Sequence, residues 1–124
     1  MNKREKGSVY EEKAVKKLEE NNYVILCRNY FYGKNGEIDI IARKNNLIVF
    51  VEVKYRSSDK YGSGHDSVNK TKMKRMYKTA QKYILQKKYF DLDIRFDLIA
   101  FIFKNNIEEI EWLENILWGD EIGC

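Results

Sequence analysis

The chain has 124 residues, which is room for one ordinary domain rather than two. Apolar residues make up 44% of it and charged residues 34%, so the composition fits neither a disordered chain nor a membrane protein. Two cysteines and a single histidine exclude a disulfide scaffold and a cysteine-rich zinc site. We expect a soluble cytoplasmic protein with one domain over residues 1–124, a core over about 7–112 and a tail over 113–124 whose structure the pattern leaves open.

The net charge of +4 is distributed unevenly along the chain. Residues 53–90 contain 11 basic and 2 acidic side chains, a net charge of +9, whereas residues 91–124 contain 2 basic and 9 acidic ones, a net charge of −7. An excess of positive charge in one segment attracts polyanions such as nucleic acid. A solvated helix face that only keeps the protein in solution is an equally good explanation of the basic segment taken alone.

The periodicity of the apolar residues predicts two helices and five strands in the order α-β-β-β-α-β-β. The first helix is expected to begin with Ser8 as its N-cap, and Glu11 would close a capping box. Helices that bracket a sheet in this order are typical of an α/β fold with a mixed central sheet flanked by helices. The expected helices cover 8–21 and 67–88, the expected strands cover 23–31, 37–43, 47–54, 93–103 and 107–112, and a loop covers 55–66.

The hairpin formed by the second and third strands contains acidic residues at unusual positions. If its turn has two or four residues, opposed residue numbers sum to 91, which places Asp39 across from Glu52. The same register places Glu37 across from Lys54. Alternation puts Glu37 and Asp39 on one face of their strand and the intervening isoleucines on the other. Like charges that face each other destabilise a sheet, and a carboxylate among apolar neighbours must be neutralised, paired or bound to a metal.

Asp39, Glu52 and Lys54 together indicate a Mg²⁺ site that hydrolyses phosphodiester bonds. Two carboxylates are the typical protein contribution to bound Mg²⁺, and such an ion polarises a phosphoryl group and lowers the pKa of the attacking water. Lys54 projects from the same strand face as Glu52, where it would stabilise the charge that develops on phosphate. The alternative is an ion pair at a frayed hairpin end. Glu11 falls on the apolar arc of its helix, and its alternative role is that of an N-terminal residue favoured by the helix dipole.

These residues carry a resemblance to a known family. The segment GEIDII at 36–41, with twelve residues between Asp39 and Glu52 and then EVK at 52–54, resembles the PD-(D/E)XK nuclease motif. The chain as a whole resembles the small YraN-type bacterial proteins, which are predicted nucleases related in fold to archaeal Holliday-junction resolvases and restriction endonucleases. Beyond the hairpin, the resemblance includes EEKA at 11–14, RNY at 28–30, Val68, Lys72 and RFD at 95–97.

The resemblance implies a restriction-endonuclease-like α-β-β-β-α-β core and a metal-dependent endonuclease that acts on DNA. It implies that Asp39 and Glu52 bind the metal and that the backbone carbonyl of Val53 is a further ligand. Lys54 would then be the catalytic lysine, and Glu11 would correspond to the helix glutamate of the resolvase-like branch. Mg²⁺ is the expected cofactor, with Mn²⁺ as its substitute.

The expected partner is nucleic acid, DNA rather than RNA, with no membrane partner. By analogy with the resolvases, structured or branched DNA is the expected substrate, and a homodimer would suit a substrate that is cut in two strands. A nucleic-acid-binding module that keeps the nuclease fold without catalysis stays open as an alternative, and so does an RNA-directed nuclease. The basic residues expected to contact phosphates are Arg56, Lys60, Lys70, Lys72 and Lys74.

Overall fold

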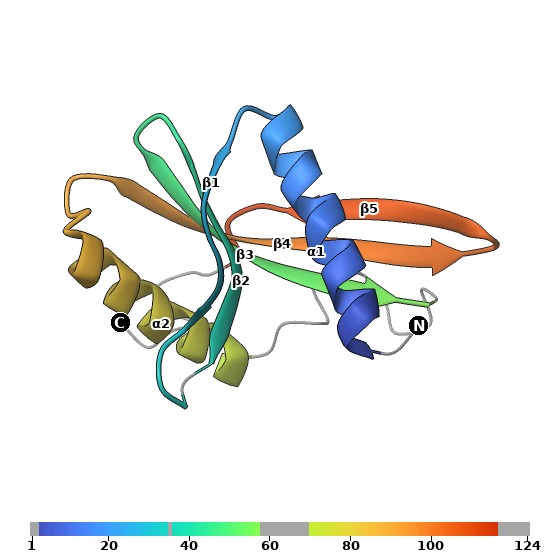
Figure 1. The fold of residues 1–124 in the computed structure, drawn as a ribbon, viewed down its shortest axis with the longest axis horizontal. Helices are drawn as coiled ribbons and strands as arrows, with labels where there is room; N and C mark the ends of the chain where they lie inside the picture. The colour runs from blue at the N-terminus through green and yellow to red at the C-terminus, as the bar shows by residue number, and fades with distance from the viewer. Residues whose placement is uncertain (1–2, 35, 58–69, 117–124) are drawn as a thin grey trace.

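A computed structural model describes residues 3–34, 36–57 and 70–116 (Figure 1). Over these residues the chain forms two α-helices and five β-strands in the order that the apolar periodicity predicts. Most of the expected loop, the start of the second expected helix and the end of the C-terminal tail lie outside the described residues. The elements are α1 (Lys3–Glu20), β1 (Val24–Phe31), β2 (Glu37–Lys44), β3 (Leu47–Arg56), α2 (Lys70–Lys87), β4 (Asp93–Lys104) and β5 (Ile107–Leu113).

The strands form one mixed sheet in the order β1-β2-β3-β4-β5. Antiparallel ladders join β1 to β2, β2 to β3 and β4 to β5, whereas β3 and β4 run parallel because the connection through α2 returns the chain to the end of the sheet where β3 begins. The β2–β3 hairpin turns on Asn45 and Asn46, so opposed numbers sum to 91 as predicted. Asn45 has a φ of 55°, a left-handed conformation that asparagine tolerates in tight turns. The predicted α/β class is therefore confirmed, in an arrangement consistent with a restriction-endonuclease-like core.

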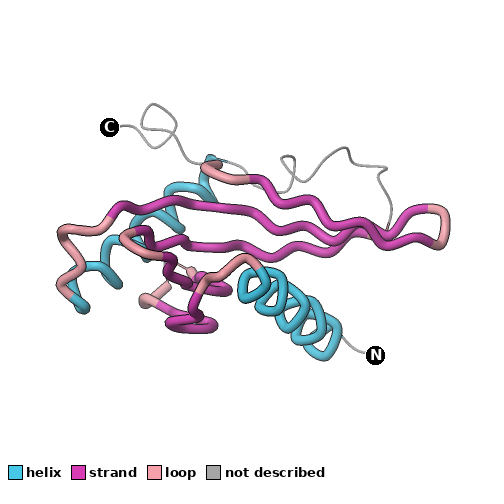
Figure 2. Tube along the Cα trace, turned by 90° about the horizontal axis from the view of Figure 1, so that it is seen from above, coloured by secondary structure: helices cyan, strands magenta, loops and turns pink. Residues whose placement is uncertain are grey.

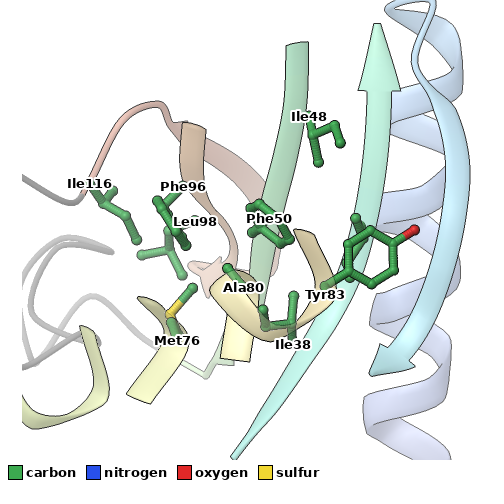
Figure 3. Close-up of a cluster of buried hydrophobic side chains, with 10 residues drawn as sticks. Ile38, Ile48, Phe50, Met76, Ala80, Tyr83, Phe96, Leu98 and Ile116 are labelled. Carbon is green, nitrogen blue, oxygen red and sulfur yellow. The ribbon is translucent and has the colours of Figure 1, made fainter. Parts of the chain in front are cut away.

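The two helices pack against opposite faces of this sheet, and α1 lies along one side of it (Figure 2). Alternate residues of β3 enter different hydrophobic clusters: Val49 and Val51 join the cluster that includes α1, whereas Ile48 and Phe50 join the one that includes α2. Because both faces of β3 are buried, its sequence is a nearly continuous apolar run rather than an alternating one. Figure 3 shows the second cluster, to which α2 contributes Met76, Ala80 and Tyr83.

The N-terminal boundary of α1 and the course of β2 differ from the sequence-based expectations. The helix begins at Lys3, since the residues before Gly7 are good helix formers, so Ser8 lies inside it and the predicted cap is wrong. Ile38 and Ile40 enter clusters on opposite faces of the sheet instead of sharing one. The reason is that β3 pairs with β2 only as far as Ile40, and β2 follows β1 alone before that point.

A buried carboxylate of β4, opposite Val51 in the β3–β4 ladder, holds the C-terminal part of the described chain. Asp97 of β4 is 0% exposed and accepts hydrogen bonds of 2.9 and 2.8 Å from the Arg95 guanidinium. It also accepts hydrogen bonds from the indole N–H of Trp112 and from the amide of Asn115, while Arg95 donates another to the Tyr23 hydroxyl. Because its charge and acceptor sites are satisfied by the fold itself, Asp97 has a structural role.

Candidate functional site

The candidate site forms where β2 and β3 separate. Their ladder ends at the pair Ile40–Val51, and beyond it the amide of Val53 donates a hydrogen bond of 2.8 Å to Oδ2 of Asp39. The Asp39 carboxylate thus accepts a hydrogen bond from β3 in place of a backbone carbonyl of β2, and it is held between the two strands. Asp39 and Glu52 are the next positions in the predicted register, and their charges interact, although strand pairing does not extend to them.

A group of three carboxylates, here called the carboxylate cluster, meets beside this separation. One ligand oxygen from each of Glu11, Glu37 and Asp39 lies within 4.8 Å of the other two. The expected opposition of Glu37 and Lys54 is not formed, because the β2–β3 ladder ends at Ile40–Val51, and Glu37 keeps only its pairing with Phe31 of β1. The cluster therefore combines one residue of α1 with two of β2, whereas the expected metal ligands, Asp39, Glu52 and the carbonyl of Val53, all lay in the β2–β3 hairpin.

Glu11 reaches the cluster from the middle of α1. Because the helix begins at Lys3, Glu11 stands two turns inside it, so neither the capping box nor the helix dipole explains its inward position. Its Oε1 atom is buried and has no hydrogen-bond partner among the described residues, and Nη2 of Arg28 lies 3.8 Å from it. A buried acceptor without a donor is rare in folded proteins, and a bound cation would satisfy it.

The crowding of these carboxylates changes how they bind protons. Burial, followed by repulsion from Glu52, raises the pKa of Asp39 from 3.8 to about 8, against the opposing effect of the Val53 hydrogen bond. Burial and the neighbouring charge of Glu11 also raise the pKa of Glu37. Near neutral pH the cluster therefore retains a proton that it would release on binding a cation.

Glu52 is the buried acid of the hairpin, and two lysines hold it on the α2 side of the sheet. Its Oε1 atom lies 2.5 Å from Nζ of Lys72 and 3.5 Å from Nζ of Lys54. Burial and the adjacent Lys72 lower the pKa of Lys54. Burial acts to lower the pKa of Lys72 as well, but the charges of Glu52 and Asp39 outweigh it and raise that pKa.

The basic residues expected to bind nucleic acid occupy different places. Lys70 and Lys74 are exposed on α2, Lys72 turns inward to Glu52, and Lys60 lies outside the described residues. Arg56 is half-buried at the end of β3. Beside Lys74, α2 also presents a shallow hollow of about 240 Å³, lined by Thr71, Lys74, Arg75 and Lys78.

This basic face of α2 lies next to the start of β2. A Cβ atom placed on Gly36 would be 3.8 Å from the Cβ of Arg75, and Figure 1 shows the first turns of α2 beside the β1–β2 turn. A spacing of four residues from Lys70 through Lys74 to Lys78 was visible in the sequence and is the signal that identifies Lys78. Arg75 has no comparable local signal, because its position depends on how α2 packs.

The oxygen donors of the carboxylate cluster fit a hard divalent cation such as Mg²⁺ or Mn²⁺. Glu11 and Asp39 were expected at the site and belong to the cluster, whereas Glu37 was not expected there. The alternation of Glu37 and Asp39 along β2 was the signal that pointed to it. Glu52 lies beside the cluster, and the contact recorded between Val53 and Asp39 uses the amide of Val53 rather than its carbonyl.

The fold and the site together define a class: an α/β domain in which the helix before the sheet and a splayed central hairpin bring carboxylates together beside a lysine-paired glutamate. Within that class, the chain belongs to the family described as "Uncharacterised protein family UPF0102", whose model matches residues 10–101. The resemblance to the YraN-type family is thereby confirmed at the level of family. Among the described residues, no helix combines the length and the apolar character that a membrane span needs.

Curated relatives resemble the chain over nearly its whole length. A UPF0102 protein of Fusobacterium nucleatum is 48% identical over 123 residues, which covers 99% of both chains. A UPF0102 protein of a Sulfurihydrogenibium species is 45% identical over 93% of this chain and 96% of its own, and one of Acetivibrio thermocellus is 44% identical over 89% and 85%.

Proposed function

We propose that the protein is a Mg²⁺-dependent nuclease of the PD-(D/E)XK type that hydrolyses phosphodiester bonds in DNA, with structured or branched DNA as its preferred substrate. One observation carries this proposal: carboxylates from α1 and β2 converge within 4.8 Å of one another beside the ion-paired Glu52 and Lys54. Clustered carboxylates repel one another when ionised, so a bound cation would stabilise their ionised forms.

Glu11, Glu37 and Asp39 are the residues that would hold the cation, with Glu52 adjacent. When bound, a divalent cation polarises the phosphoryl group, lowers the pKa of the attacking water and offsets the charge of the carboxylates. The Val53 amide orients Asp39 through its 2.8 Å hydrogen bond to Oδ2, so this carboxylate is held in place before a cation binds. Since burial and repulsion raise the pKa of Asp39 to about 8, cation binding is expected to strengthen as pH rises.

Lys54 is the group suited to handle a proton at the reacting water. It projects on the same face of β3 as Glu52, and the 3.5 Å ion pair holds its Nζ atom in place. Burial and Lys72 lower its pKa, so Lys54 exchanges a proton more readily near neutral pH than an ordinary lysine does. Lys72 pairs more closely with Glu52 and serves as a positioning residue for it.

The basic face of α2 supports nucleic acid as the substrate. Lys74, Arg75 and Lys78 gather beside the β1–β2 turn, next to the strand that carries Glu37 and Asp39. Contacts between such side chains and phosphates position a strand independently of its sequence.

The test is cleavage of labelled four-way junction, flap, duplex and single-stranded DNA, with matched RNA strands, in Mg²⁺ or Mn²⁺. EDTA and the Asp39→Asn protein should each abolish cutting, by at least about 100-fold for the variant, a loss typical of removing one electrostatic contact from an active site. The Glu19→Gln protein serves as the matched control, because Glu19 is an exposed residue of α1 and its replacement removes the same charge.

The outcomes separate the candidate functions. Cutting that is lost in EDTA and in Asp39→Asn, and kept in Glu19→Gln, supports the metallonuclease. Binding without cutting in any metal would replace it by a binding module that keeps the fold, and cutting of RNA alone would replace it by an RNA-directed nuclease.

A further inference from the structure

We infer that the substrate carries an unpaired base next to the scissile phosphate and that Phe31 is the surface on which this base stacks. The inference rests on the proposed function and adds to it the class of substrate that the site accepts. The observation behind it is a cavity between α1, β1 and β2.

This cavity has a volume of about 550 Å³, within the range of about 300–1,000 Å³ that is typical of ligand sites. Two members of the carboxylate cluster, Glu11 and Glu37, form part of its wall, so its occupant lies against the proposed metal ligands. Arg28, Asn29 and Phe31 of β1 form another part. The Arg28 guanidinium matches the phosphate of a nucleotide, the Asn29 amide matches the edge of its base, and the Phe31 ring matches the face of that base.

Phe31 is placed to contact a base rather than to fill the core. Its side chain is 64% exposed although phenylalanine is among the most apolar residues. In the β1–β2 ladder it stands directly opposite Glu37, and cross-strand neighbours have Cβ atoms about 4.5–5.5 Å apart. Because β1 is the edge strand of the sheet, a ligand can reach Phe31 from outside.

Arg28 supplies the positive charge of this cavity wall. Its guanidinium donates a 2.9 Å hydrogen bond to the exposed Glu12 and lies 3.8 Å from Oε1 of Glu11. A guanidinium that is shared between two carboxylates is available to a phosphate once a cation neutralises Glu11. The neighbouring Asn29 has a φ of 53°, a left-handed conformation that interrupts the regular course of β1 next to the cavity.

Stacking on Phe31 requires a base whose face is open. In a continuous duplex both faces of each base are covered by neighbouring bases, whereas single strands, flaps and branch points expose them. The position of Phe31 opposite Glu37 therefore favours nucleic acids with an unpaired base adjacent to the cut over fully paired duplex.

The test compares Phe31→Leu with Phe31→Tyr and with Phe90→Leu. Phe90 is the matched control, since its side chain is also 64% exposed. It lies at the other end of the sheet, where the amide of Asp93 bonds the carbonyl of Asn46 in the β2–β3 turn. Binding of fluorescein-labelled single-stranded, flap and blunt duplex DNA is measured by anisotropy in Ca²⁺, together with the fluorescence of a 2-aminopurine base placed at the flap junction.

Phe31→Leu should weaken binding of single-stranded and flap DNA by about tenfold, in line with the loss of one stacked base, and leave duplex binding unchanged. Phe31→Tyr and Phe90→Leu should bind like the wild type, and quenching of 2-aminopurine should disappear in Phe31→Leu alone. Equal affinities of Phe31→Leu and wild type for all three DNAs, or an equal loss on all three, would overturn the inference and leave the proposed function standing. A wild-type protein that binds none of these DNAs and no RNA would instead overturn the proposed function, and the inference with it.

Discussion

Replacing Asp39 by asparagine should stabilise the metal-free protein, and the gain in stability should be about three times larger at pH 9 than at pH 5. Burial and then repulsion from Glu52 raise the pKa of Asp39 from 3.8 to about 8. Between these values the folded protein keeps a proton that the unfolded chain has released, so the free energy of unfolding falls as pH rises and the loss is complete above about pH 8. Asparagine carries no charge, and its side-chain carbonyl can still accept the hydrogen bond from Val53.

The size of the effect follows from that change in pKa. Each pKa unit corresponds to about 1.4 kcal/mol, so a rise from 3.8 to about 8 sets a ceiling of ~6 kcal/mol. Glu37 takes part in the same repulsion, and its own pKa is raised mainly by burial and secondly by the charge of Glu11. Replacing Asp39 removes one of these charges and so relieves only part of the repulsion. We therefore expect the substitution to recover roughly half of the ceiling, ~3 kcal/mol, above pH 8.

The assay is urea denaturation followed by circular dichroism at pH 5, 7 and 9 in EDTA, for wild type, Asp39→Asn and the Glu19→Gln control. The free energy of unfolding of Asp39→Asn should exceed that of wild type by an amount that grows from ~1 kcal/mol at pH 5 to about 3 kcal/mol at pH 9, because pH 5 already lies above the ordinary aspartate pKa of 3.8. Glu19→Gln should follow the wild type throughout. A difference between Asp39→Asn and wild type that stays constant over the pH range would refute the reasoning, because Asp39 would then ionise like an exposed carboxylate.

Three further predictions concern the metal, the fold and nucleic-acid binding. In a thermal-shift assay, Mg²⁺ or Mn²⁺ should raise the melting temperature more at pH 8 than at pH 6, because the cation must displace a proton from the carboxylate cluster. Glu37→Gln should lose most of this rise. An undiminished rise in the variant would exclude Glu37 as a ligand. Asp97→Ala should lower the free energy of unfolding by about 3–5 kcal/mol, since it removes the buried carboxylate that pairs with Arg95 and leaves that guanidinium facing the exposed Glu114, 3.7 Å away. A loss below about 1 kcal/mol in urea denaturation would contradict the anchoring role of Asp97. Lys74→Ala and Lys78→Ala should each reduce the slope of log affinity against log salt concentration for duplex DNA by about 0.9, measured by anisotropy; unchanged slopes would place the phosphate contacts elsewhere.

Local patterns in the sequence were sufficient for the hairpin at the centre of the site. Asn45 and Asn46 form a turn of even length, which sets the register of β2 against β3 and brings Asp39 near Glu52. Lys54 follows Glu52 by two positions on one strand, so the two must share a face. These relations hold where the strand stays regular. They fail in β2 beyond Ile40, where the ladder with β3 ends and Ile38 and Ile40 enter clusters on opposite faces.

The sequence by itself therefore determined the element order, the α/β class, the hairpin register and the neighbourhood of Asp39, Glu52 and Lys54. Only the tertiary structure decided that Glu37 joins Glu11 and Asp39 in one cluster, and that Lys72 pairs with Glu52. The physical reason is that these contacts cross from helix to sheet. Their geometry depends on how α1 and α2 pack on opposite faces and on where β2 leaves β3, and neither is encoded in the period of any single segment.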